Sequence, residues 1–170
     1  MPSRARLPAP QPGALWYGID AGWWVPLERD ARRVYGQQLR WLPGPGHVEY
    51  RVTTRIDGDS SDHDLEIHFY ADPSYATFGL TSEEYPRVFG DRGLESPHRM
   101  PDGALCLWQP LDPPDRRWVP ADGLLALIEH ACRHLFCESW WRETDEWLLD
   151  QAPHGLPRRG AITGSGGRLG

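Results

Sequence analysis

A cysteine that could act as a nucleophile follows a turn in the stretch HRMPDGALCLW, which begins at His98 and contains Cys106. The Asp-Gly pair that starts at Asp102 is a strong turn signal, and a leucine on each side of Cys106 holds the backbone in place. Such a turn keeps the thiol near the surface, where a large partner can reach it. An ordinary thiol, with a pKa of about 8.5, holds only a few per cent thiolate at neutral pH. His98 or nearby backbone amides are therefore expected to raise the reactivity of Cys106.

The competing interpretation of Cys106 is a buried, inert residue that packs as a small apolar side chain, as free cysteines usually do. The chain has three cysteines, Cys106, Cys132 and Cys137, and no C-x-x-C pair. A disulfide framework is therefore not expected, and a reducing cytoplasm fits best.

The composition favours one loop-rich domain. A chain of 170 residues is long enough for one core, while 18 Gly and 17 Pro limit the length of regular elements. A net charge of −6 offers no basic face for nucleic acid, and no apolar run is long enough to span a membrane. We therefore expect a cytoplasmic protein with no nucleic-acid and no membrane partner. All 18 basic residues are arginine, a bias that fits a GC-rich genome.

Hydrophobic periodicity places a small sheet before the cysteine segment. A helix is predicted over 27–41. Period-two alternation predicts an antiparallel hairpin from strands at 48–56 and 65–69, joined by a polar tip. A third strand is predicted at 76–80 and a short fourth strand at 87–89.

Helices are predicted after the cysteine segment. A proline-rich loop over 109–120 leads to the best-defined helix, 121–141, for which Asp122 is the expected N-cap. A further helical piece is predicted over 143–150, before Pro153 stops it. This order of elements predicts the α+β class, with a small antiparallel sheet flanked by an N-terminal helix and C-terminal helices.

The two ends of the chain lack a periodic apolar pattern. Residues 1–14, rich in Pro, Ala and Arg, are predicted to be a disordered tail, and the glycine-rich residues 156–170 a flexible tail. Residues 15–155 are predicted to form a single domain.

The run SPHRMPDGALCLW, the following Trp118 and Pro120, and the long amphipathic helix resemble the active-site region of ubiquitin-conjugating enzymes. The chain resembles still more closely the bacterial relatives of those enzymes in antiphage defence operons of the cyclic-oligonucleotide (CBASS) type. Those relatives share the His, Asp-Gly and Cys-Leu pattern and a tryptophan-rich end similar to ESWWRETDEWLLDQAPHG. The resemblance covers residues 47–155, with specific motifs only from His98 to Leu107 and over 138–155.

The resemblance implies a ubiquitin-conjugating-enzyme-like fold and the activity of an acyl carrier. An E1-like activating enzyme would supply the C-terminal acyl group of a ubiquitin-like protein or of a cGAS-like nucleotidyltransferase. Cys106 would accept that group as a thioester and transfer it to an amine. Because thioester exchange is nearly isoenergetic, access and alignment matter more than strong acid–base catalysis. The resemblance implies no cofactor.

The sequence departs from the eukaryotic family where that family has His-Pro-Asn. Here the run is His98-Arg99-Met100, so the asparagine assigned to oxyanion stabilisation has no obvious counterpart. Backbone amides around Cys106, or the imidazole of His98 or His154, are the alternatives. His98 ranks above His154 because it is closer to the cysteine in sequence.

Three carboxylates are candidate supporting groups. Asp112 and Asp115 of the proline-rich loop would orient the attacking amine, and Asp102 lies in the turn before the cysteine. Acidic residues in such a loop are more often solvated charges. The lack of lysine also gains a meaning here, because an acyl carrier without lysine does not easily modify itself.

Two other classes of function stay open. One is a catalytically inactive conjugating-enzyme-like binding module, although the retained Cys106 speaks against it. The other is an unrelated cysteine hydrolase, which would need a third orienting group and an oxyanion hole that the sequence does not display.

A metal site is not expected. His130, His134 and Cys137 have the helical spacing of zinc ligands, on the side of the helix away from the leucines. No fourth ligand is evident nearby, and the histidine pair lacks the glutamate of zinc proteases. The more common outcome for such polar-face histidines is contact with solvent.

Overall fold

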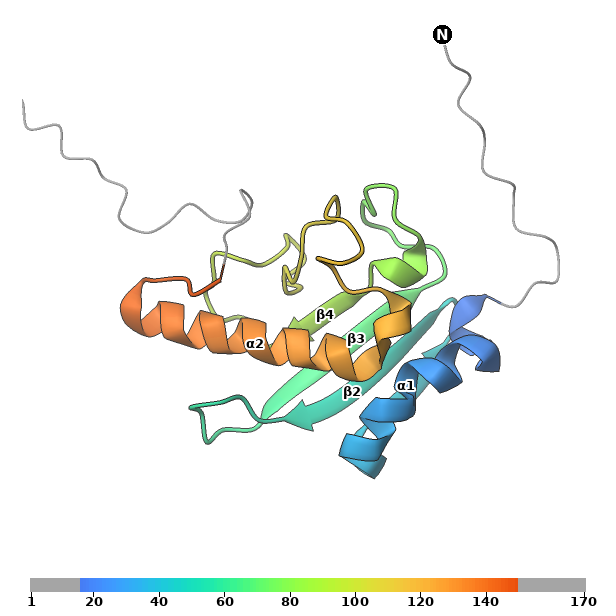
Figure 1. Ribbon diagram of the computed structural model, residues 1–170, viewed down its shortest axis with the longest axis horizontal. Coiled ribbons are helices and arrows are strands. Elements are labelled where there is room, and N and C mark those ends of the chain that lie inside the picture. Colours follow the sequence, from blue (N-terminus) through green and yellow to red (C-terminus); the bar gives the residue numbers. More distant parts are fainter. Residues whose placement is uncertain (1–15, 150–170) are drawn as a thin grey trace, which may run out of the picture.

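A four-stranded antiparallel sheet lies behind two helices in Figure 1. The computed structural model describes residues 16–149. The strands are β1 (Arg40–Gly44), β2 (His47–Thr54), β3 (His63–Tyr70) and β4 (Arg87–Gly90), and each pairs with the next in chain order. The helices are α1 (Ala21–Tyr35), before the sheet, and α2 (Gly123–Thr144), after it. Short 3-10 turns lie at Tyr17–Ile19, Gly36–Gln38, Ser82–Glu84 and Pro120–Asp122. The α+β class is confirmed.

The core lies between the sheet and the two helices. In the register of β2 and β3, Tyr50 faces Ile67, and both side chains are fully buried. Both helices pack against this face of the sheet and contribute aliphatic side chains to the core: Leu27, Ala31, Leu124, Leu127, Ile128, Ala131 and Leu135. Trp118 is also fully buried, and its indole Nε1 donates a hydrogen bond to the carbonyl of Gly123 at 2.9 Å. This bond ties the loop after the cysteine segment to the start of α2.

The first helix differs from the range of 27–41 that periodicity predicts. It begins at Ala21, because the Asp20 carboxylate accepts a hydrogen bond from the Gly22 N–H at 2.9 Å and caps the first turn. It ends before Gly36, which has a φ of 54° that continues no right-handed helix. The chain then forms β1, a strand that periodicity did not predict.

The predicted strand at 76–80 is wrong. Phe78 and Gly79 have φ values of 56° and 90°, which interrupt an extended strand. The segment is a loop that exposes Phe78. The fourth strand predicted at 87–89 is confirmed as β4.

The helix predicted over 121–141 is confirmed as α2, with two differences at its ends. The Asp122 carboxylate accepts a hydrogen bond from the Val119 N–H at 2.9 Å and makes no cap hydrogen bond to α2. α2 stops at Thr144, where Asp145 adopts a left-handed conformation. The prediction of a further helix over 143–150 is therefore wrong: residues 143 and 144 end α2, and residues 145–149 are not helical.

The predicted tails at 1–14 and 156–170 lie outside the described residues. Across residues 16–149, neither α1 nor α2 is long and apolar enough to cross a membrane.

Candidate active site at Cys106

A tight hairpin between β4 and α2 presents Cys106. The Met100 N–H donates to the carbonyl of Ala104 at 2.8 Å, and the Cys106 N–H donates to the carbonyl of His98 at 3.0 Å. The Asp-Gly turn predicted from the sequence closes this hairpin, and Gly103 has the positive φ of 85° that the turn requires. On its other side the hairpin bonds to β4. Cys106 is therefore held by backbone hydrogen bonds next to a buried strand.

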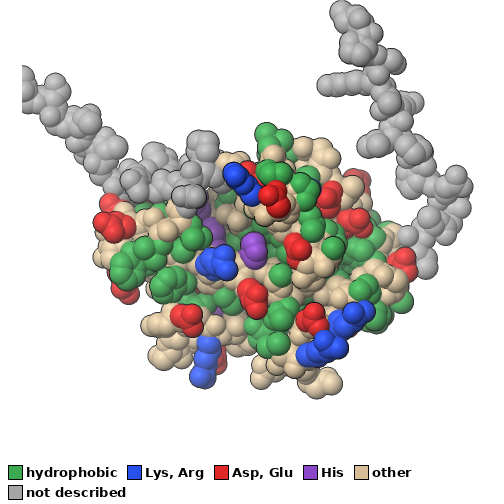
Figure 2. Space-filling view, viewed as in Figure 1, with side chains coloured by type: hydrophobic (Ala, Val, Ile, Leu, Met, Phe, Trp, Pro, Cys, Tyr) green, Lys and Arg blue, Asp and Glu red, His purple; other side chains and the backbone are tan. Residues whose placement is uncertain are grey.

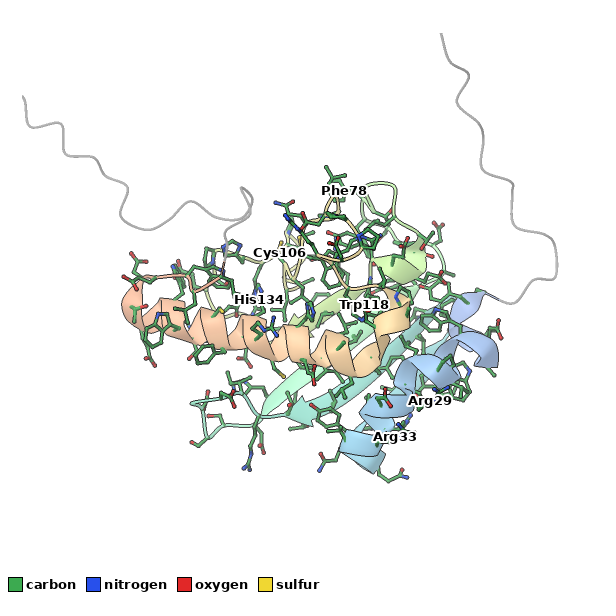
Figure 3. All side chains as sticks on the ribbon, in the orientation of Figure 1. Arg29, Arg33, Phe78, Cys106, Trp118 and His134 are labelled. Atoms are coloured by element: carbon green, nitrogen blue, oxygen red, sulfur yellow. The ribbon has the colours of Figure 1, made fainter. Side chains whose placement is uncertain are left out.

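The Cys106 side chain is partly exposed and lines a pocket of about 770 Å³, here called the Cys106 pocket. Its walls include Phe78, Tyr85, Met100 and Leu111. Figure 3 shows Cys106 above the middle of α2, below the loop that carries Phe78. A cavity of this size is in the range of ligand-binding pockets, about 300–1,000 Å³. Cys106 is thus partly buried and borders an open pocket.

The other two cysteines have different surroundings. Cys132, on α2, is partly buried with its sulfur 3.7 Å from the Thr54 hydroxyl. Cys137, also on α2, is only 1% exposed. Neither lines the Cys106 pocket. Cys137 fits the inert, core-packed role that was the alternative for Cys106.

Burial raises the pKa of the Cys106 thiol to about 11, and the positive charge of Arg87 opposes that shift. Arg87, on β4, donates to the Asp102 carboxylate at 2.8 Å and lies 3.6 Å above the Tyr75 ring. A thiol with this pKa holds about one thiolate in ten thousand molecules at pH 7. Its chemistry therefore depends on a partner or a base that takes the proton.

We expect the rate of Cys106 alkylation by iodoacetamide to rise about tenfold per pH unit and to keep rising through pH 10. The thiolate is the reactive species, and its fraction grows with pH until the pKa is reached. Peptide mapping by mass spectrometry measures the rate at Cys106 separately from Cys132 and Cys137. Circular dichroism at each pH checks that the fold is intact. A plateau at or below pH 9 would contradict the raised pKa.

His98 pairs with Cys106 through its backbone, and its ring packs against an aromatic side chain. The residue is buried, and its ring centroid lies 4.3 Å from that of Trp147. The His98 ring is not part of the lining of the Cys106 pocket. The structure thus brings His98 and Cys106 together in the hairpin and places the imidazole in an aromatic cluster.

The candidate carboxylates fall in different places. Asp102 supports the hairpin, because it pairs with Arg87 and accepts a hydrogen bond from the Ala104 N–H at 3.1 Å. Asp112 is half-buried and Asp115 is exposed, and neither lines the Cys106 pocket. His154 lies outside the described residues.

Sequence reasoning missed a buried ion-pair network that connects the hairpin to α2. The Arg99 guanidinium donates to both oxygens of Glu138, at 2.9 and 2.7 Å, and Glu138 is fully buried. His134 Nε2 lies 3.2 Å from the same carboxylate. Although burial raises the pKa of Glu138, hydrogen bonds from His134 and Arg99 bring it below its ordinary value. The i,i+4 spacing of His134 and Glu138 was visible in the sequence, but their partner Arg99 was not.

The same network corrects the assignment of the α2 histidines. His134 and Cys137 are buried rather than solvated, and His134 is engaged with Glu138. The His130 ring packs edge-on against Trp108, with centroids 6.5 Å apart. The flank of α2 that carries His134 is therefore covered by the cysteine hairpin and by Trp147, whose ring centroid lies 5.2 Å from that of His134.

A different cluster of ionisable groups lies on the face of the sheet opposite the helices. One ligand atom each from Glu49, Glu66 and His68 lies within 4.8 Å of the others. Both carboxylates are already paired, Glu49 with Arg51 and Glu66 with Arg92 at 2.8 Å. Two guanidinium groups would oppose a bound cation. This cluster is an ion-pair network and gives no argument for a metal ion.

No family model, curated protein sequence or solved structure matches the chain. The function proposed for the chain therefore depends on the geometry and chemistry of the site together with the sequence motifs around Cys106.

Proposed function

We propose that the protein is a ubiquitin-conjugating-enzyme-like acyl carrier that holds a C-terminal acyl group as a thioester on Cys106. The order of elements supports this proposal, because a helix, an antiparallel sheet, the cysteine segment and a long helix follow one another as the resemblance implies. The observation that carries it is that Cys106, alone among the three cysteines, opens onto the large pocket.

The raised pKa of the Cys106 thiol is compatible with a carrier that holds an acyl group as a thioester. In thiol exchange, a thiolate of higher pKa is intrinsically more nucleophilic and is a poorer leaving group. By the same reasoning, an acyl group on Cys106 is released less readily to water than one on an acidic thiol. The low thiolate fraction makes loading depend on alignment with a donor thioester, which is the step that a binding pocket promotes.

The partners follow from the resemblance and are part of the proposal. An E1-like activating enzyme supplies the thioester, and a ubiquitin-like protein or a cGAS-like nucleotidyltransferase provides the acyl group in bacterial antiviral defence. The final acceptor is an amine.

Acyl transfer from a synthetic donor tests the proposal. The probe is the peptide acetyl-Ala-Ala-Leu-Gly as its mercaptoethanesulfonate thioester, and intact-mass spectrometry follows the protein. We expect a single peptide adduct that dithiothreitol removes, formed at a rate that saturates with peptide concentration. Saturation is expected because transfer occurs within a bound complex.

Two controls isolate Cys106. Cys106→Ala is expected to abolish the dithiothreitol-sensitive adduct, and Cys132→Ser is expected to retain it. The same chain in concentrated urea gives the rate of adduct formation for a thiol that is not aligned with its donor. That rate is expected to depend linearly on peptide concentration. A linear dependence in the folded protein, or equal labelling of Cys132, would overturn the acyl-carrier proposal.

A further inference from the structure

The walls of the Cys106 pocket are mainly apolar and aromatic. Phe78 is 56% exposed and Leu111 is 82% exposed, although both side chains are large and apolar. Figure 2 shows hydrophobic side chains at the upper edge of the molecule, where Figure 3 labels Phe78. Tyr85 forms the wall beneath, with its ring edge-on to Phe78 at 6.2 Å and to Trp108 at 6.3 Å. An occupant that covers these side chains removes apolar surface from water.

The pocket presents no unneutralised charge. Arg99 is the one charged residue among the described residues that line it, and the Glu138 carboxylate binds its guanidinium through two hydrogen bonds. Arg87, whose charge acts on Cys106, is paired with Asp102 through a single hydrogen bond of 2.8 Å. A charged occupant would lose its hydration without gaining a partner, which is costly. The chemistry of the pocket therefore favours an uncharged, apolar group.

The position of the sulfur determines which part of a donor enters the pocket. The carbonyl carbon of the donor's last residue is bonded to Cys106 Sγ in the thioester. Because consecutive Cα atoms are about 3.8 Å apart, the side chain of the preceding residue begins about one residue's length from the thioester, which is within reach of a pocket of about 770 Å³ that opens at the sulfur. That side chain is the first one that the apolar walls can contact.

We propose that the Cys106 pocket selects acyl donors that carry a large apolar side chain next to their carboxyl-terminal residue. This selection presupposes the acyl-carrier function proposed above. In the transfer step the Cys106 sulfur attacks the donor carbonyl and a new C–S bond forms. The bond to the leaving thiol breaks, and that thiol takes up the proton that Cys106 loses.

A series of peptide thioesters tests the selection. The peptides acetyl-Ala-Ala-X-Gly, with X as Leu, Ser, Asp or Arg, share the same terminal glycine and the same leaving thiol, so their intrinsic reactivities are closely matched. Intact-mass spectrometry measures the rate constant at low peptide concentration. We expect the Leu peptide to react roughly tenfold faster than the Ser peptide, because burial of a leucine side chain favours its complex by that factor or more. The Asp and Arg peptides are expected to be slowest.

Substitutions in the wall of the Cys106 pocket test whether these side chains cause the preference for the Leu peptide. Phe78→Asn removes the ring, and asparagine tolerates the positive φ of this position. This variant and Leu111→Ser are expected to bring the ratio of Leu to Ser rates towards one. Val34→Ser, which removes an apolar side chain that is 62% exposed from α1, is the matched control and is expected to keep the ratio.

The outcomes separate this inference from the proposed function. Equal rates for all four peptides, each transferred to Cys106 with saturation, would refute the apolar selection and leave the acyl carrier standing. A faster Asp or Arg peptide would also refute it. Absence of transfer from every peptide would refute both.

Discussion

Glu138→Ala is expected to destabilise the protein by about 3–5 kcal/mol, because it leaves the Arg99 guanidinium buried without its carboxylate. The pair is bidentate, and the Arg99 side chain is only 10% exposed, so water replaces the lost partner poorly. Chemical denaturation followed by circular dichroism measures the free energy of unfolding.

A double variant and a surface pair provide the controls. Replacing both partners, as Arg99→Met with Glu138→Met, is expected to recover most of the loss, because no buried charge is then left alone. Arg33→Ala, which breaks an exposed pair with Asp30, is expected to cost less than about 1 kcal/mol. If Glu138→Ala lowered the free energy of unfolding no more than Arg33→Ala does, the result would contradict a buried ion pair at this position.

Leu111→Lys is expected to turn the carrier into its own acceptor. Leu111 lines the Cys106 pocket and is highly exposed, so a lysine there brings a primary amine close to the acyl group on Cys106. The amine attacks the thioester carbonyl, a C–N bond forms and the C–S bond breaks, and the sulfur regains a proton. Proximity makes this intramolecular transfer fast. After loading with the peptide thioester, we expect an adduct that dithiothreitol does not remove.

The control for this experiment places the lysine elsewhere. The natural chain has no lysine, so any internal amide arises at the introduced residue or at the N-terminal amine. Arg33→Lys introduces the same amine on α1, far from Cys106 in Figure 3. Its adduct is expected to stay sensitive to dithiothreitol. Equal amounts of the dithiothreitol-resistant adduct in both variants would show that the distance of the lysine from Cys106 does not affect acyl transfer.

The sequence predicts elements whose signal is local. The alternation of β2 and β3 and the apolar spacing of α2 are periodic over many residues, and the Asp-Gly turn before Cys106 is specified by two residues. The start of α1 depends on the single cap of Asp20, and β1 depends on its pairing with β2. Neither of these leaves a strong local pattern, so neither was predicted.

The site was predicted only in part for the same reason. Cys106 and its turn follow from adjacent residues, whereas Arg99 and Glu138 are 39 positions apart and meet only in the folded chain. His134 was expected to be solvated because it lies on the more polar side of α2. The cysteine hairpin and Trp147 cover the flank of α2 that carries His134, and this tertiary contact has no periodic signature.

The fate of an acyl group already on Cys106 tests the account most directly. The protein is loaded with the Leu peptide thioester, the donor is removed by rapid gel filtration, and intact mass is followed with and without methylamine. The account predicts that the adduct persists in buffer and that methylamine accelerates its loss, with the peptide recovered as its methylamide. Rapid release of the free peptide acid in buffer, with repeated turnover of fresh donor, would instead identify a hydrolase and contradict the acyl carrier.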